Sequence, residues 1–541
     1  MVRRILAALA AVLVTGTVLA AGKPADWQVG GGNVLNTRSA DGEKRIAVDT
    51  VASLQLLWSV KLKGAVIAAT PVSDGSSLFL PTSLGHVVRV ARISGVVEWD
   101  VALDEVTGIA GAGSKASLAL SGDAIILGLA NAPVVVALSK KDGRQLWQAR
   151  IDDDAKVYSI QAPLVADGRV FIGTANATEE GATLWDNPTC CVFRGQIAAL
   201  DAATGRLLWR FHPLPEGFAG GAVWGSTPIY DAGRRSLYIT TGNGFRAPPE
   251  VQACADANRD DRDRLRACYP KDAWFDSIVA LDVATGRVKW GFRAEDYDFF
   301  TGVCLYPKDE RKNPYCGNGP DHDFGQGAML WRVGGRDLVG AGQKSGEFWA
   351  LDAESGALVW TRKLGPGGAS GGILGGSATD GRRLYVAEAN TKQIGRGPIS
   401  YTLPSGESIN YGSYAALDPA TGSILWQVAD PAGQEYPVTD KPCTLEAAVS
   451  NANNLAAGTP ARPSDCRGAY ASGPVTIANG VLFGCSTAPP GPLYAFDAAS
   501  GKLLWSFDTG SGCRSGAAVM DGVVYWASGR TLRAFAPKPA N

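Results

Sequence analysis

Short runs of alternating apolar and polar residues recur along this chain, and most of them end in a tryptophan. The clearest copy is ALDAATGRLLW, in which an apolar run leads through Asp and Thr-Gly into a second apolar run that ends at Trp209. Period-two alternation broken by a turn signal predicts two adjacent antiparallel strands. Related copies end at Trp58, Trp99, Trp147, Trp290, Trp360, Trp426 and Trp505. Each copy therefore predicts one supersecondary unit of the same kind.

Eight such units predict an all-β protein, an eight-bladed β-propeller with one sheet per blade. Gly205 and its counterparts suit a turn position with positive φ, and the preceding Asp can bond its own turn backbone. Each repeat tryptophan is expected to cover a neighbouring blade while its indole N–H donates to a backbone carbonyl. These eight tryptophans are therefore interpreted as core residues.

The two ends of the chain predict how the ring closes. After Trp505 come three strand-like segments, 516–520, 522–527 and 531–536, but no further tryptophan strand. Leu54–Lys61 is expected to supply the missing strand, so that no sheet edge stays exposed.

Successive repeat tryptophans lie 41 to 81 residues apart, whereas a four-stranded blade needs only about 40 to 50. The surplus is expected in long loops, which on a rigid scaffold are usually functional. These loops fall at about residues 175–195, 245–275, 300–322, 392–412 and 433–468.

The N-terminus and the composition indicate an exported protein. Residues 1–21 combine two arginines, an apolar run and small residues, as a signal peptide does, and 22–541 are expected to form one propeller domain. The apolar run is too short for a membrane span. Because the formal net charge is -1 and no basic run stands out, no nucleic-acid partner is expected.

Ten cysteines, an even set, agree with an oxidising compartment. Local pairs are expected for Cys254 with Cys268, Cys304 with Cys316, and Cys443 with Cys466, each closing one insertion. Cys485 and Cys513 occupy similar places in successive blades, and Cys190 and Cys191 are adjacent. No CxxCH motif is present, so no attached haem is expected.

The repeated A-x-D-x-x-T-G-x-x-x-W motif resembles that of the pyrroloquinoline quinone (PQQ) dehydrogenases, and Trp27 followed by Asn36-Thr37-Arg38 resembles their N-terminal segment. Three segments are most similar to polyvinyl-alcohol dehydrogenases: CCVFRG (190–195), GPDHDFG (319–325) and AGQKSG (341–346). The repeat alone also occurs in non-catalytic outer-membrane assembly propellers, so function depends on the site.

The resemblance implies a cofactor and a metal ion. Val223-Trp224-Gly225 followed by Thr241-Gly242-Asn243 matches the family arrangement in which Trp224 stacks on the quinone and Asn243 binds the metal. Either Glu179 or Glu180 is expected as a second ligand, the alternative being that both are solvated loop charges. Such oxygen donors favour Ca²⁺, and a chain with three histidines offers little for zinc or haem.

The resemblance also implies a general base, for which the chain has two contenders. Asp298 follows Tyr297, but Asp323 directly precedes the strand at 328–331, and this register favours Asp323 as base and metal ligand. A carboxylate there can accept the alcohol proton. Lys344 matches the basic residue that the family directs at the quinone oxygens, where it would stabilise negative charge.

Further cofactor contacts are implied for Asn390 and for the adjacent cysteines. Cys190 and Cys191 either form a disulfide that caps the cofactor or pair elsewhere. No arginine matches the family residue that binds cofactor carboxylates in an early blade, and Lys115 is the candidate in its place.

Together these features predict a periplasmic, PQQ- and Ca²⁺-dependent alcohol dehydrogenase. It would oxidise a primary or secondary alcohol, small or polymeric, and pass electrons to an external cytochrome c. The alternative is a non-catalytic propeller that acts as a binding or assembly scaffold.

Overall fold

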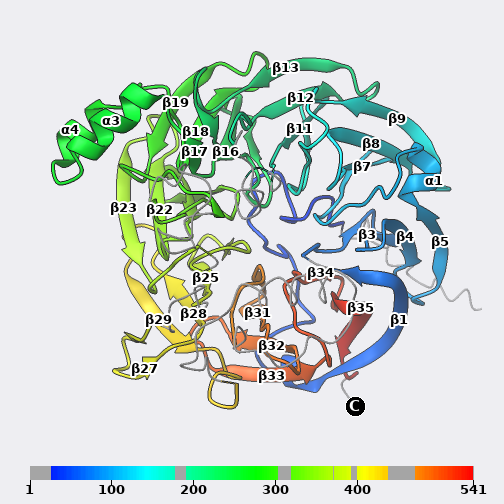
Figure 1. The fold of residues 1–541 in the computed structure, drawn as a ribbon. Coiled ribbons are helices and arrows are strands. Elements are labelled where there is room, and N and C mark those ends of the chain that lie inside the picture. Colours follow the sequence, from blue (N-terminus) through cyan, green and yellow to red (C-terminus); the bar gives the residue numbers. More distant parts are fainter. Residues whose placement is uncertain are drawn as a thin grey trace, which may run out of the picture.

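Antiparallel sheets stand as eight blades around a common centre in the computed structural model (Figure 1). The structure describes residues 26–66, 68–176, 179, 190–302, 319–369, 371–390, 399–436 and 469–539. The blades follow one another around the ring in chain order, and the first strand of each blade is innermost. The predicted eight-bladed β-propeller is confirmed.

Seven blades have four strands each. Blade 1 consists of β2 (Val72–Ser73), β3 (Ser77–Pro81), β4 (His86–Ala91) and β5 (Val97–Ala102), and blade 2 of β6 (Ala119–Ser121), β7 (Ala124–Gly128), β8 (Val134–Ser139) and β9 (Gln145–Arg150). Blade 3 consists of β10 (Leu164–Ala166), β11 (Arg169–Gly173), β12 (Ile197–Asp201) and β13 (Leu207–Phe211), and blade 4 of β15 (Ile229–Asp231), β16 (Ser236–Thr240), β18 (Ser277–Asp282) and β19 (Val288–Arg293). Blades 5 to 7 consist of β20 (Met329–Val333), β21 (Arg336–Gly342), β22 (Glu347–Asp352) and β23 (Leu358–Lys363); β24 (Ala378–Thr379), β25 (Leu384–Glu388), β28 (Ser413–Leu417) and β29 (Ile424–Ala429); β30 (Thr476–Ala478), β31 (Val481–Cys485), β32 (Pro492–Asp497) and β33 (Leu503–Asp508).

Blade 8 joins the two ends of the described chain. Its strands are β34 (Ala518–Met520), β35 (Val523–Pro537) and β1 (Leu54–Val66), which the 3-10 turn η1 (Val51–Ser53) precedes. The expected ring closure is therefore confirmed, but the expectation of separate strands at 522–527 and 531–536 is wrong. They form the single strand β35, because pairing with β1 continues from Pro537 back to Gly529.

Seven of the eight repeat tryptophans make the expected indole-to-carbonyl bond between blades. Trp209 Nε1 donates to the Val283 carbonyl of the next blade at 3.2 Å, and Gly286, at φ 70°, lies against the indole ring. A Cβ on Gly286 would lie 2.6 Å from the indole, so the turn needs glycine for space as well as conformation. Equivalent indole-to-carbonyl bonds come from Trp99, Trp147, Trp290, Trp360, Trp426 and Trp505.

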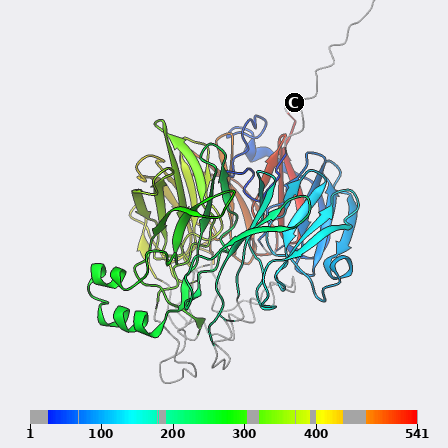
Figure 2. The same cartoon turned by 90° about the horizontal axis from the view of Figure 1, so that it is seen from above.

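Insertions leave the ring mainly on one side (Figure 2). The insertion after β17 (Gly244–Arg246) forms the helices α3 (Pro249–Ala257) and α4 (Arg262–Ala267), and the Cys254–Cys268 disulfide joins them as predicted. A two-stranded sheet of β14 (Ala219–Gly220) and β17, a hairpin of β26 (Tyr401–Thr402) and β27 (Ser408–Ile409), and the helix α1 (Leu103–Thr107) complete the described elements.

Residues 26–50 cross the centre of the ring and touch the innermost strands of several blades. Trp27 bridges to Ser73 in blade 1, and Val29 bridges to Ala119 in blade 2. Their backbone also pairs at Val34 with Tyr230, Leu35 with Leu330, Thr37 with Thr379, and Ser39 with Ile477. This segment ties blades 1, 2, 4, 5, 6 and 7 together from within.

Candidate active site

Four of the predicted site residues come together at the ends of blades 4 and 5. Trp224 lies before β15, Asn243 follows β16, Asp323 lies before β20, and Lys344 follows β21. A Cβ on Gly242 would lie 2.8 Å from Asp323 Oδ1 and 3.1 Å from Trp224 Nε1. Glycine at that position therefore allows the carboxylate and the indole to approach the same backbone.

Asp323 is buried and hydrogen-bonded at both oxygens. Its Oδ1 accepts from the Asn243 backbone N–H at 2.5 Å, and its Oδ2 accepts from Lys344 Nζ at 2.8 Å. The Lys344 backbone N–H also donates to the Asp323 carbonyl. These contacts fix the position of the carboxylate.

Lys344 has a second carboxylate that the sequence analysis missed. Its Nζ lies 2.8 Å from Asp321 Oδ1 and 5.4 Å from the centroid of the Trp224 ring. Asp321, Asp323 and Lys344 are all at most 6% exposed. The only sequence signal for Asp321 was its place in GPDHDFG, two residues before the expected base.

Asp298 lies behind this cluster and holds the segment that carries Asp323. Its carboxylate accepts the backbone N–H groups of Asp321 at 3.0 Å and His322 at 2.6 Å. Burial raises the pKa of Asp298 to about 7. Asp298 thus contacts the backbone of the segment that carries Asp323, whereas Asp323 contacts Asn243 and Lys344 directly; Asp323 as the base stays a prediction.

A second buried acid, Asp276, adjoins Asp298. Burial, together with the charge of Asp298, raises the pKa of Asp276 well above its ordinary value. Both Asp276 oxygens are buried without a hydrogen-bond partner in the described part of the chain. Because two such carboxylates cannot readily both ionise, Asp276 is expected to stay protonated.

Glu179 anchors the segment with the adjacent cysteines. Its Oε2 accepts the backbone N–H groups of Val192 at 2.9 Å and Phe193 at 2.8 Å. Cys190 and Cys191 are bonded to each other, which is one of the two alternatives left open by the sequence. They lie in a buried cluster against which Trp224 packs. Metal binding by Glu179 and capping by this disulfide stay predictions.

Asn390 and Lys115 do not join the cluster around Asp323. Asn390 Nδ2 donates to the Ile399 carbonyl at 2.7 Å, while its buried Oδ1 has no partner among the described residues. Lys115 is exposed ahead of β6 in blade 2. Their cofactor contacts therefore stay predictions.

Several expectations fall on parts of the chain that the structure does not describe. Glu180, the signal peptide at 1–21, and the Cys304–Cys316 and Cys443–Cys466 pairs lie outside the described residues. Within the described ranges, no three His, Cys, Asp or Glu side chains gather as a metal site, and no helix is long and apolar enough to cross a membrane.

The residues present fit a flat quinone beside a hard cation. Both Asn243 Nδ2 protons are used, by the Gly244 and Phe300 carbonyls, while Oδ1 accepts no hydrogen bond within the described ranges. That oxygen and Asp323 are the hard donors that such an ion prefers. The two carboxyl groups of Asp321 and Asp323 outnumber the one ammonium group of Lys344, which suits a bound cation. The partly exposed Trp224 ring offers a surface on which a flat ring can stack.

Two family models match this chain. A family model described as the β-propeller domain of glucose, ethanol and alcohol dehydrogenases matches residues 151–301. A second model, described as outer membrane protein assembly factor BamB, matches residues 20–191, 275–438 and 410–540. The assembly-factor model covers most of the chain, and over residues 151–301 and in its curated relatives the chain is similar to PQQ-dependent alcohol dehydrogenases.

Curated relatives cover nearly the whole chain. A polyvinylalcohol dehydrogenase of Sphingopyxis sp. (strain 113P3) is 27% identical over 89% of this chain and 68% of its own length. Another, from Pseudomonas sp., is 27% identical over 92% of this chain and 71% of its own length. These relatives are similar to this chain in sequence over most of its length.

Solved structures support the fold. Quinohemoprotein alcohol dehydrogenase from Comamonas testosteroni superposes with a TM-score of 0.65 at 19% identity, covering 95% of this chain and 81% of its own. A europium-containing methanol dehydrogenase superposes with a TM-score of 0.64 at 16% identity, covering 95% and 98%. At these identities the likeness shows the shared fold.

Proposed function

We propose that this protein is an exported, periplasmic enzyme that uses PQQ and Ca²⁺ to oxidise a primary or secondary alcohol, small or polymeric. Electrons would pass to an external cytochrome c. The observation that carries the proposal is the convergence of Trp224, Asn243, Asp323 and Lys344 at one corner of the ring. None of the four belongs to the repeat that joins the blades.

When bound, PQQ accepts the two electrons of the alcohol, and the metal ion polarises the quinone carbonyl. Asp323 accepts the proton of the substrate hydroxyl as hydride leaves the adjacent carbon. Lys344 stabilises negative charge that develops at this corner, since its ammonium lies 2.8 Å from each of Asp321 and Asp323. Trp224 supports the flat ring system from one side.

Reconstitution tests this proposal. Purified protein is loaded with PQQ and Ca²⁺, and alcohol-dependent reduction of a dye and of cytochrome c is measured with small primary alcohols, secondary alcohols and polyvinyl alcohol. We expect turnover that needs PQQ, the metal ion and an alcohol together. Replacing Ca²⁺ by a lanthanide ion tests the choice of metal.

PQQ binding without turnover of any alcohol would contradict the enzyme proposal. Absence of PQQ binding would favour the scaffold alternative. Activity with a lanthanide ion but not with Ca²⁺ would overturn only the metal assignment.

A further inference from the structure

Eight short segments that precede the innermost strands form a belt around the centre of the ring, with direct contacts at seven of the eight junctions and Gly30 between Ser117 and Ala162 at the eighth. The inner belt comprises residues 68–71, 114–118, 159–163, 224–228, 323–328, 374–377, 472–475 and 514–517. Three hydrogen bonds join neighbouring segments: Thr70 N–H donates to Ser117 Oγ at 2.8 Å, Ala162 N–H to the Ser226 carbonyl at 2.8 Å, and Gly327 N–H to Ser226 Oγ at 2.9 Å. Further neighbours meet by close packing of glycines: Gly325 against Leu374, Gly375 against Gly473, Gly473 against Arg514, and Gly516 against Thr70. Residues of this belt therefore share one level of the ring.

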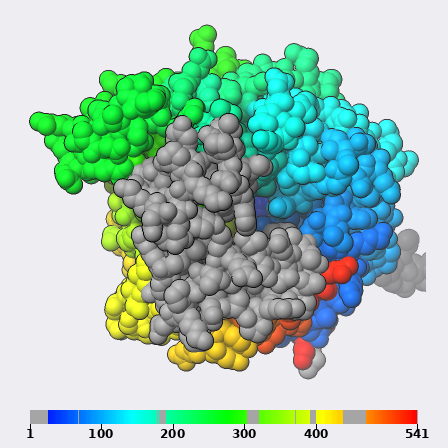
Figure 3. Space-filling view, in the orientation of Figure 1, coloured from blue at the N-terminus to red at the C-terminus, as the bar shows by residue number. Residues whose placement is uncertain are grey.

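Trp224 and Arg514 lie on this belt at opposite sides of the ring. Trp224 precedes β15 of blade 4, and Arg514 precedes β34 of blade 8, four blades away in a ring of eight (Figure 1). The space-filling view shows the ring hollowed near its centre, with the N-terminal segment visible in the depth (Figure 3). A flat ligand stacked on Trp224 would thus present its far edge to the blade of Arg514.

Arg514 is exposed, yet protein surrounds it. Solvent reaches its side chain, while desolvation lowers the pKa of its guanidinium. The combination is typical of a group on the wall of a recess. In the described part of the chain no carboxylate forms an ion pair with Arg514. The one ionisable group there that affects the pKa of its guanidinium is the Tyr470 hydroxyl.

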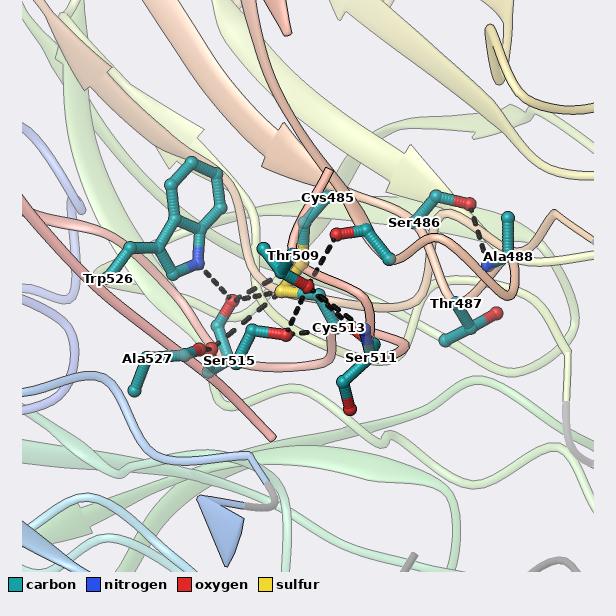
Figure 4. Close-up of a disulfide and its surroundings, with 12 residues drawn as sticks. Cys485, Ser486, Thr487, Ala488, Thr509, Ser511, Cys513, Ser515, Trp526 and Ala527 are labelled. Atoms are coloured by element: carbon teal, nitrogen blue, oxygen red, sulfur yellow. Dashed lines mark hydrogen bonds between the residues drawn. A yellow bond between two sulfur atoms is a disulfide. The ribbon is translucent and has the colours of Figure 1, made fainter. Parts of the chain in front are cut away.

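The backbone on either side of Arg514 is held rigidly. Cys513 is bonded to Cys485, and its N–H donates to the Ser486 carbonyl at 3.0 Å. On the other side, the Ser515 carbonyl accepts from Trp526 Nε1 at 3.0 Å (Figure 4). Cys513 and Ser515 are each 1% exposed. An unpaired cation on so fixed a support is preorganised for an anionic ligand.

We propose that Arg514 binds a carboxylate of PQQ at the edge remote from the quinone oxygens. This inference rests on the proposed function. PQQ is a flat tricarboxylate, and Lys344, Asn243 and Asp323 at blades 4 and 5 define where its quinone oxygens would lie. The opposite edge then faces blade 8, where a guanidinium can hold a carboxylate through two parallel hydrogen bonds. Arg514 would thus take the role that the sequence analysis assigned to Lys115.

Binding measurements on the apoprotein test this directly. Quenching of tryptophan fluorescence by PQQ in the presence of Ca²⁺ gives Kd for wild type, Arg514→Gln, Arg514→Lys and Lys115→Gln. Arg206→Gln, on an exposed hairpin, is the matched control. We expect Arg514→Gln to weaken binding by roughly 10- to 100-fold, the usual contribution of a charged hydrogen bond, and Arg514→Lys to weaken it less.

The trimethyl ester of PQQ identifies the group that Arg514 contacts. The ester should bind wild type more weakly than PQQ does, and Arg514→Gln should not weaken it further. Because Arg514 is exposed and makes no ion pair, the apoprotein variant should melt as wild type does.

Equal PQQ affinity in wild type and Arg514→Gln would overturn this inference while the proposed function stands. A large loss in Lys115→Gln with none in Arg514→Gln would return the role to Lys115. Absence of PQQ binding to wild type would instead remove the proposed function itself.

Discussion

At the scale of single residues, the site depends on a lysine that lies between two buried carboxylates. Lys344 Nζ is equally close to Asp321 and Asp323, and only Asp323 also contacts Asn243. This asymmetry supports Asp323 as the base. Asp298 accepts hydrogen bonds from two backbone N–H groups of the same segment, so we expect it to position Asp323.

Substituting the two aspartates separates chemistry from positioning. Asp323→Asn should keep the fold and lower alcohol-dependent turnover by about 10²- to 10⁴-fold, because it removes the proton acceptor. Asp298→Asn should mainly lower the melting temperature, because the NH₂ group of the new amide would face a backbone N–H that the carboxylate accepts. Turnover and melting temperature measured together check both. Full activity of Asp323→Asn would show that the base is assigned wrongly.

Two tryptophans of different surroundings provide another test. Trp224→Ala should weaken PQQ binding strongly with little effect on unfolding. Trp290→Ala should instead lower the free energy of unfolding by roughly 3 kcal/mol, because it removes the indole between two blades and its bond to the Ala353 carbonyl. Fluorescence titration and chemical denaturation measure the two effects. Similar changes in both variants would remove the distinction between stacking and blade-joining tryptophans.

At the scale of elements, a buried polar network joins β25 to the β26–β27 hairpin. Tyr401 Oη lies 3.0 Å from a carboxyl oxygen of Glu388, at the end of β25, and 3.1 Å from the Tyr411 carbonyl. It also lies 3.0 Å from Ser413 Oγ, and its one O–H can donate to one of these oxygens at a time. The other Glu388 oxygen is buried without a partner in the described ranges. Burial raises the pKa of Glu388 to about 8.

This raised pKa predicts how stability depends on pH. Between about pH 4.5 and 8 the unfolded chain loses the Glu388 proton while the folded protein keeps it, so the contribution of Glu388 to stability falls as pH rises. Glu388→Gln should remove this dependence. The free energy of unfolding of the variant should exceed that of wild type by an amount that grows with pH to an upper limit of about 4 kcal/mol by pH 8. Denaturation at pH 5 and pH 8 measures it. An equal pH dependence in both proteins would contradict the raised pKa.

At the scale of the whole molecule, the ring is closed by strands from both ends of the chain. β1 pairs with β35 along Leu54 to Lys61, so no blade has an open edge at the junction. Residues 26–50 further join six blades from within. A ligand at the centre therefore adds its binding free energy to a single closed assembly.

Cofactor binding should consequently raise the unfolding temperature. PQQ with Ca²⁺ at about a hundredfold excess over Kd should stabilise the folded state by about 2.7 kcal/mol, since the unfolded chain has no assembled site. Calorimetry with and without the cofactor, and with Ca²⁺ alone as the control, measures the shift. An unchanged transition at saturating cofactor would favour the scaffold alternative.

The sequence by itself determined the blades, because each repeat encodes its own turn, strand pair and tryptophan contact within a few residues. The Cys254–Cys268 pair followed from the same local logic, and ring closure by β1 followed from the strand that the last blade lacks. By contrast, Asp321 beside Lys344, Asp298 behind Asp323, and Arg514 across the ring from Trp224 depend on loops from different blades meeting at one level. Only closure of the ring brings such loops together, so the tertiary structure decided the surroundings of the site.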